Sequence, residues 1–459
     1  MHYPLTNAHP ALKPHDDDPC EIASFRPIQA RSDGMKPNAF ANTVARLFFP
    51  QTAQLRLDFS SFSPRLQQRI VYAGANTSSF ANASRDFFHL LDLRIDPKHF
   101  ERLTHRIGQE RIDERDAICE DWLDMTLTER DVPEADIVAP DLAVVEMDGG
   151  RLQVRSDAPS HGKSDTSHWK EDKIGVLLSM TSQTHEVDPC PEIPDCFVNP
   201  QYATQLAVEV GHVTLPVGEI PPAGSDDQPP TRGRPGLPEP LVKSVIATRH
   251  TVEDFGPLLA SAAHERNFQG AKRQAFIADG SSANEGVRKR YFPRYVSILD
   301  FIHALSYVYS GAMAGRSFAE GWPIYCEWIQ WIWSGEVGRV IAALESRQGE
   351  LGVGAPEESE SRPVCVVGTS LVYLINHSSQ MDYASYRREG LPLMSSAVES
   401  TIKQINARVK GTEKFWSDGG SEAVLQLRSD YLSETDPMSE FWTRRQERLN
   451  GFRPYRNAG

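Results

Sequence analysis

Apolar and polar positions follow two different periods along this chain, and the changes between them outline its elements. Strand-like apolar runs occur at residues 141–148, 151–156, 173–183, 274–278 and 295–300. The first three follow one another at the spacing typical of neighbouring antiparallel strands. Helical periodicity predicts helices at 252–266 and 301–313. This mixed order of strands and helices predicts an α/β layer architecture and not a helical bundle.

The region before the first strand has a helical pattern. It predicts helices at 66–73 and 79–91, and a third that runs to Ile107, with Asp96 as N-cap and Pro97 at its first position. Short helices with basic residues on the last one are typical of a helix-turn-helix. An ordinary helical subdomain is the alternative that the pattern leaves open.

The predicted organisation has five parts. They are a flexible leader at 1–60, a helical unit at 61–140, the first part of the core at 141–300, a helical insertion at 301–370, and the final part of the core with the C-terminal tail at 371–459. Within the core, residues 184–240 are dense in Pro, Asp and Gly, which predicts a long surface excursion. The insertion is rich in tryptophan, including Trp328 and Trp333, which we interpret as core packing, with base stacking as the alternative.

Composition adds a constraint on partners. The chain has 459 residues, 40% of them hydrophobic, and a formal net charge of −14, which argues against a protein that coats nucleic acid over its whole surface. A local basic groove remains compatible with this charge, because association responds to the local field. The stretch from Lys243 to Arg294 has more Lys and Arg than Asp and Glu.

The cysteines and the N-terminus bear on the compartment. The six cysteines form no CxxC pair, so we expect mostly reduced thiols in a cytoplasmic protein. Cys190 and Cys196 are a weak alternative as zinc ligands. The polar N-terminus and the absence of a long apolar segment predict neither a signal peptide nor a membrane span.

Three acidic residues carry the candidate chemistry. Asp148 and Asp279 are each expected to end a buried strand, and each is followed by glycine, while Glu399 opens an amphipathic helical stretch. Two aspartates at neighbouring strand ends and a glutamate on a nearby helix can hold two Mg²⁺ or Mn²⁺ ions roughly 3.5–4 Å apart. Such a pair of ions can activate the nucleophile and stabilise the leaving oxygen in phosphodiester cleavage.

Several blocks resemble the bacterial insertion-sequence transposases of the ISKra type, which are related to Mutator-like elements. The blocks are MDGGRLQVR with HWKEDKIGVLL, then FIADG, ILDFIHAL and MDYASYRREGLPLMSSAVEST, in that order. The resemblance covers roughly residues 60–430, and its last block is the most specific. It implies an RNase H-like mixed sheet flanked by helices, with a helical insertion before the catalytic glutamate.

The resemblance also implies roles for individual residues. Asp148, Asp279 and Glu399 would be the catalytic metal ligands, with Asp300 and His303 as accessory residues. Candidate DNA contacts are the basic residues near these positions, namely Arg288, Lys289, Arg290, Arg387, Arg388, Lys403, Arg408 and Lys410. The sequence departs from the family at Met394–Ala397, where a glycine-containing turn usually precedes the glutamate.

The function expected from this resemblance is DNA transposition. A DDE-type transposase would cut the ends of its element and join them to target DNA, as a homodimer that pairs two terminal inverted repeats through the helical unit at 61–140. The alternative is a domesticated, catalytically silent DNA-binding protein. A cellular nuclease on the same fold is a third possibility.

Overall fold

The computed structural model describes residues 62–154, 169–210, 237–352, 362–411 and 414–451. Its strands are β1 (Leu142–Gln153), β2 (Trp169–Met180), β3 (Pro240–Thr248), β4 (Arg273–Ala278) and β5 (Val296–Leu299). The helices up to β5 are α2 (Pro64–Asn76), α3 (Phe80–Leu91), α4 (Pro97–Asp124), α5 (Leu127–Arg130), α6 (Pro200–Glu209), α7 (Val252–Glu265) and α8 (Ser282–Tyr291). Those after β5 are α9 (Phe301–Met313), α10 (Phe318–Trp333), α11 (Val337–Leu351), α12 (Pro363–His377), α13 (Tyr383–Arg388), α14 (Ser396–Val409), α15 (Asp418–Leu432) and α16 (Pro437–Gly451). The predicted leader at 1–60 lies outside the described residues.

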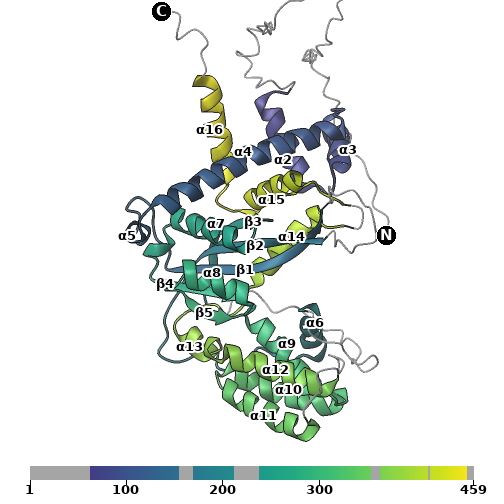
Figure 1. The fold of residues 1–459 in the computed structure, drawn as a ribbon, viewed down its shortest axis with the longest axis vertical. Coiled ribbons are helices and arrows are strands. Elements are labelled where there is room, and N and C mark those ends of the chain that lie inside the picture. Colours follow the sequence, from purple (N-terminus) through teal and green to yellow (C-terminus); the bar gives the residue numbers. More distant parts are fainter. Residues whose placement is uncertain (1–61, 155–168, 211–236, 353–361, 412–413, 452–459) are drawn as a thin grey trace, which may run out of the picture. The chain divides into compact units, whose positions relative to one another are not determined.

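The five strands form one mixed, open sheet in the order β3-β2-β1-β4-β5 (Figure 1). β2 runs antiparallel to both β1 and β3, whereas β4 is parallel to β1 and β5 is parallel to β4. The α/β class with a mixed sheet flanked by helices was therefore predicted correctly from the sequence.

Alternation along β1 sends its side chains to two different cores. Ala143, Val145 and Met147 pack with Phe255 and Leu259 of α7 on one face of the sheet. Leu142 and Val144 face the other side, where the largest core lies. Because side chains alternate along a strand, Glu146 and Asp148 project toward that second side as well.

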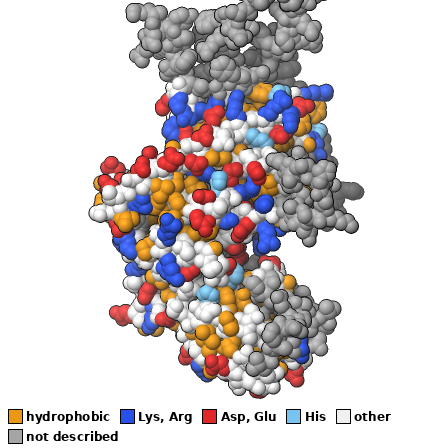
Figure 2. All heavy atoms as spheres, viewed as in Figure 1, with side chains coloured by type: hydrophobic (Ala, Val, Ile, Leu, Met, Phe, Trp, Pro, Cys, Tyr) orange, Lys and Arg blue, Asp and Glu red, His pale blue; other side chains and the backbone are white. Residues whose placement is uncertain are grey.

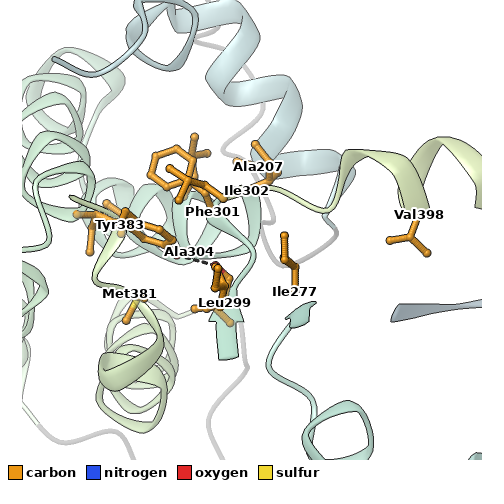
Figure 3. Close-up of a cluster of buried hydrophobic side chains, with 14 of the residues drawn as sticks. Ala207, Ile277, Leu299, Phe301, Ile302, Ala304, Met381, Tyr383 and Val398 are labelled. Atoms are coloured by element: carbon orange, nitrogen blue, oxygen red, sulfur yellow. Dashed lines mark hydrogen bonds between the residues drawn. The ribbon is translucent and has the colours of Figure 1, made fainter. Parts of the chain in front are cut away.

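The second face is covered by α14, which packs on β1 and β2, and by the segment that follows β5. Figure 3 shows part of this core, where Ile277 and Leu299 at the strand ends lie near Phe301 of α9. The hydroxyl of Tyr383 donates a hydrogen bond of 2.9 Å to the carbonyl of Leu299. This contact ties the block before Glu399 to the end of β5.

Helices α9 to α12 gather beyond the β5 edge of the sheet (Figure 1). Trp328 and Trp333 of α10 are 4% and 2% exposed, and the indole N–H of Trp333 donates to the carbonyl of Cys190 at 2.9 Å. The interpretation of these two tryptophans as core residues is confirmed. No helix in the described ranges combines the length and the apolar character that crossing a bilayer requires.

The N-terminal helices pack on α15. Gly108 of α4 allows this close approach, because a Cβ there would lie 2.6 Å from both the Cβ and the carbonyl oxygen of Ala423. The Arg111 guanidinium, buried at this crossing, donates to both carboxylate oxygens of Asp430 at 2.9 and 3.2 Å. The N-cap Asp96 and the helix start at Pro97 are as predicted.

Four predictions about the elements were wrong. Helix α4 continues to Asp124 and does not end at Ile107. β1 runs without a break through Gly149 and Gly150, so Asp148 lies inside a strand and does not end one. The single strand β1 therefore replaces the two strands predicted at 141–148 and 151–156. The three neighbouring antiparallel strands are β1, β2 and β3. The predicted surface excursion at 184–240 includes α6, whose buried alanines pack in the core beside α9.

Candidate functional site

Parallel pairing places three aspartates side by side across the sheet. β1 pairs Met147 with Ala278 of β4, which in turn pairs with Leu299 of β5. The next residue along each of these three segments is an aspartate, namely Asp148, Asp279 and Asp300. Because neighbouring strands lie about 4.8 Å apart, the three aspartates lie near one another at one level of the sheet.

Asp148 is partly buried on the face covered by α14. Its carboxylate accepts a hydrogen bond of 2.7 Å from the backbone N–H of Gly149. Burial, together with the negative charge of Asp279, raises the pKa of Asp148 to about 6 against the opposing effect of the Gly149 hydrogen bond. The charge of Asp279 therefore acts on the carboxyl of Asp148.

Asp279 lies in a turn that the surrounding residues hold firmly. One of its carboxylate oxygens accepts hydrogen bonds of 2.8 Å from the N–H of Ser281 and from the side-chain amide of Asn284. Its carbonyl accepts a 2.7 Å hydrogen bond from the hydroxyl of Tyr373. Gly280 adopts a φ of +82°, a conformation that favours glycine, which explains the glycine directly after this aspartate.

Asp300 is fully buried, and its carboxylate makes hydrogen bonds with three partners. One carboxylate oxygen accepts from the backbone N–H groups of Ile302 and Ser395, at 3.3 and 3.2 Å. The other lies 2.8 Å from Nδ1 of His303. Although burial lowers the pKa of His303, the hydrogen bond to Asp300 and the charges of Asp300, Asp279 and Asp148 raise it to about 9. In the metal-free protein these interactions favour the protonated, cationic form of His303 at neutral pH.

Glu399 lies in the first turn of α14 and closes the cluster. Burial raises its pKa to about 7, and the charge of Asp300 adds to this shift. Among the described residues, Asp300, His303 and Glu399 each offer one ligand atom within 4.8 Å of the others, so this group could hold a metal ion. Asp148 and Asp279 lie outside that tight group but couple to it through their charges.

Glu146 is a site residue that the sequence reasoning missed. It is 2% exposed and accepts a hydrogen bond of 2.7 Å from the backbone N–H of Val398 in α14. Burial raises its pKa to about 8, with a further contribution from the charges of Asp300 and Glu399. Its signal was a glutamate inside the apolar run LAVVEM at 142–147. It lies two residues before Asp148 and therefore on the same face of the strand.

The donor set fits a divalent cation. Glu146, Asp148, Asp279, Asp300 and Glu399 bring five carboxyl groups to one region, with His303 as the opposing charge. The raised pKa values of Asp148 and Glu399 follow from removing these groups from water and placing them beside one another. A cation bound between hard oxygen ligands would relieve both costs.

The turn before Glu399 does not need the glycines of the resembling family. Ser395 has φ −92° and ψ 35°, and no residue of 394–397 has a positive φ. Instead, the N–H of Ser395 is held by Asp300 and that of Val398 by Glu146. The departure from the family's pattern therefore leaves α14 anchored at its first turn.

Two of the basic residues predicted to contact DNA are buried. Arg387 is 0% exposed, pairs with Asp188 and lies over the ring of Trp333. Arg408 is 3% exposed and donates to the carbonyl of Gly74 at 3.0 Å. Both guanidinium groups face the interior, so neither belongs among the candidate DNA contacts.

The remaining basic candidates lie nearer the surface. Lys289 and Lys403 have side chains that are 68% and 69% exposed, and each pairs with a nearby glutamate. Arg288 also pairs with Glu285, whereas Arg290, Arg388 and Lys410 are exposed. Figure 2 shows lysine and arginine side chains interspersed with acidic ones on the visible face, without one continuous basic patch there.

Sequence comparison gives no independent guide to this site. Neither a protein-family model nor a curated protein matches this chain.

Proposed function

We propose that this chain is a metal-dependent DNA transposase with an RNase H-like catalytic core. The observation that carries the proposal is the convergence of Asp148, Asp279, Asp300 and Glu399 from distant segments at one side of a mixed sheet. An antiparallel trio of strands beside two parallel ones is the arrangement expected of an RNase H-like core. The sequence resemblance supplies the reaction, and the clustered carboxylates support it.

In this proposal the carboxylates of Asp148, Asp279 and Glu399 hold two Mg²⁺ or Mn²⁺ ions. Bound ions of this kind activate water and stabilise charge on the phosphodiester. Asp300 orients His303 through Nδ1, and the resulting cation offsets the charge of a phosphate that enters the site. Glu146 and Asp300 fix the N-terminal turn of α14 and thereby the position of Glu399.

The proposed chemistry has two steps. Water attacks the phosphorus at the element end, the P–O3′ bond breaks, and the element keeps a 3′-OH while the flank keeps a 5′-phosphate. The new 3′-OH then attacks a phosphodiester of target DNA and displaces the O3′ of that strand. No protein nucleophile is needed. The partner is double-stranded DNA, and a homodimer would bring two ends together.

Exposed lysines near the site suit DNA phosphates. Lys403 lies one helical turn after Glu399, and its pairing with Glu209 joins two largely exposed side chains. Exposed ion pairs of this kind contribute about 0–1 kcal/mol, so the lysine can exchange its partner for a phosphate at little cost.

The test is cleavage of DNA that carries the genomic sequences flanking the gene. Asp148→Asn, Asp279→Asn and Glu399→Gln should each reduce Mg²⁺-dependent cleavage about a hundredfold or more. Asp418→Asn is the matched control, because the Asp418 side chain is 73% exposed and pairs with Arg249 outside the cluster. Cleavage at the wild-type level by all three site variants would refute the proposal.

The same assay separates the rival functions. Binding of the flanking DNA without metal-dependent cleavage would favour the silent DNA-binding protein. Cleavage without joining of the new 3′ end to a second DNA would favour a nuclease.

A further inference from the structure

A groove lies directly beside the carboxylate cluster, on the helices that follow β5. It has a volume of about 560 Å³. Its lining comes from α9, α11 and α12, namely Tyr307, Gln348, Val364, Cys365, Gly368, Thr369, Val372, Tyr373, Asn376 and His377. Nothing in the proposed catalytic steps uses these side chains.

One face of α9 connects the groove to the site. Every residue of this helix is buried except His303 and Tyr307. These two lie one turn apart on the same side of the helix. His303 contacts Asp300 at the carboxylate cluster, and Tyr307 lines the groove. The accessible stripe of α9 therefore runs from the candidate metal ligands into the groove.

Aromatic rings form a ladder along this path. The rings of Tyr307 and Tyr373 are stacked, with centroids 3.6 Å apart and an interplanar angle of 16°. The ring of His377 follows at 4.7 Å from that of Tyr373. The ladder is fixed to the site at two points, because the Tyr373 hydroxyl binds the carbonyl of Asp279 and His377 lies against Gly280.

The remaining lining combines polar side chains with the apolar Val364 and Val372 and contains no carboxylate. Gln348 and Asn376 offer amide donors and acceptors, and Thr369 offers a hydroxyl. A nucleobase combines an aromatic face with hydrogen-bonding edges, and its attached phosphate would meet no negative side chain of the lining. Among the tryptophans considered for base stacking, Trp328 and Trp333 are buried in the core. Trp322 and Trp331 are partly buried and do not line this groove.

We infer that the groove between α9, α11 and α12 binds an unpaired nucleotide of the DNA strand next to the cleaved phosphate, with its base added to the Tyr307–Tyr373 ladder. This inference rests on the proposed function and adds a binding subsite to it. The subsite selects DNA that is frayed or unpaired beside the cut, because a base in a closed duplex has no free face. Amide groups at the rim contact the base edge and the ladder supplies the stacking.

The test uses the full-length protein and a short duplex whose 3′ overhang carries 2-aminopurine, with Ca²⁺ in place of Mg²⁺. Stacking of the probe on the ladder should quench its fluorescence. Tyr307→Ala should abolish the quenching and weaken binding of the overhang duplex about tenfold relative to the blunt duplex. Tyr307→Phe keeps the ring and should behave as wild type.

Two further variants make the result independent of folding defects. Thr369→Trp adds a ring from an exposed position of α12 and should fill the groove and block the quenching without removing any contact. Ile375→Ala is the matched control, because Ile375 is exposed on the same helix but outside the groove. It should leave both fluorescence and binding unchanged.

The outcomes are distinguishable. A protein that binds and cleaves DNA, but shows no quenching or loses none with Tyr307→Ala and Thr369→Trp, overturns this inference alone. A protein that binds neither duplex overturns the proposed function and this inference together.

Discussion

Neutralising Asp148 should stabilise the metal-free protein. Burial raises the pKa of this carboxyl to about 6, against about 3.9 in an unfolded chain. Because the folded-state pKa is raised, the contribution of this carboxyl to the free energy of unfolding is fully present below about pH 4. That contribution is lost as the pH rises through 6. The gap of about two pH units corresponds to an upper limit of about 3 kcal/mol.

The expected gain is smaller than this limit. Asp148 is partly exposed, and solvent and salt screen its repulsion by Asp279 and Asp300. We therefore expect Asp148→Asn to raise the free energy of unfolding by about 1–2 kcal/mol at about pH 7.5 in EDTA. Near pH 4 the gain should vanish, because the wild-type carboxyl is then protonated in the folded protein.

Urea unfolding with and without Mg²⁺ measures both the gain from neutralising Asp148 and the stabilisation by the bound ion. Wild-type protein should gain stability from Mg²⁺, whereas Asp148→Asn should gain much less because it lacks one ligand. Asp141→Asn is the control, since Lys272 holds the pKa of Asp141 below its usual value, and its neutralisation should not stabilise. A less stable Asp148→Asn protein in EDTA, or an equal response of both proteins to Mg²⁺, would refute the reasoning.

Three further predictions concern the supports of the site and of the fold. Asp300→Asn should lower the pKa of His303 from about 9, which NMR titration of the imidazole would detect, and an unchanged pKa would contradict the assigned pair. Glu146→Ala should weaken Mn²⁺ binding by displacing α14. Glu146→Gln keeps an acceptor for the buried N–H of Val398 and should bind Mn²⁺ more tightly than the alanine variant. Equal Mn²⁺ affinities of the two variants would exclude the positioning role of Glu146. Gly108→Ala should lower the free energy of unfolding by about 1–3 kcal/mol. Gly286→Ala has open space around its Cβ position and should raise the free energy of unfolding by about 0.5–1 kcal/mol, as measured by thermal unfolding. Similar effects of both changes would contradict the packing of α4 on α15.

The positions of β4 and β5 and several residues of the acidic cluster were predictable because their signals are local. The apolar runs before Asp279 and Asp300 have the length and composition of buried strands, and the structure places β4 and β5 there. The N-cap role of Asp300 also follows from its position before an apolar helix. Local patterns therefore identified most of the residues in the carboxylate cluster, with Glu146 as the exception.

Other features depend on contacts that sequence patterns do not encode. A pair of glycines after Asp148 is typical of a turn, but tertiary pairing with β2 carries β1 through both of them. Arg387 and Arg408 appear in the sequence as surface cations, yet Asp188 and the carbonyl of Gly74 bind them in the interior. Burial of a charged residue requires a partner. The partners of Arg387 and Arg408 are distant in the sequence, so local patterns cannot reveal them.

The most direct test of the site is anomalous diffraction from crystals soaked with Mn²⁺. The account predicts Mn²⁺ peaks bound by the carboxylates of Asp148, Asp279 and Glu399, and their loss in Asp148→Asn crystals. The absence of Mn²⁺ from this cluster in well-ordered crystals, or its binding only at exposed carboxylates elsewhere, would contradict the account.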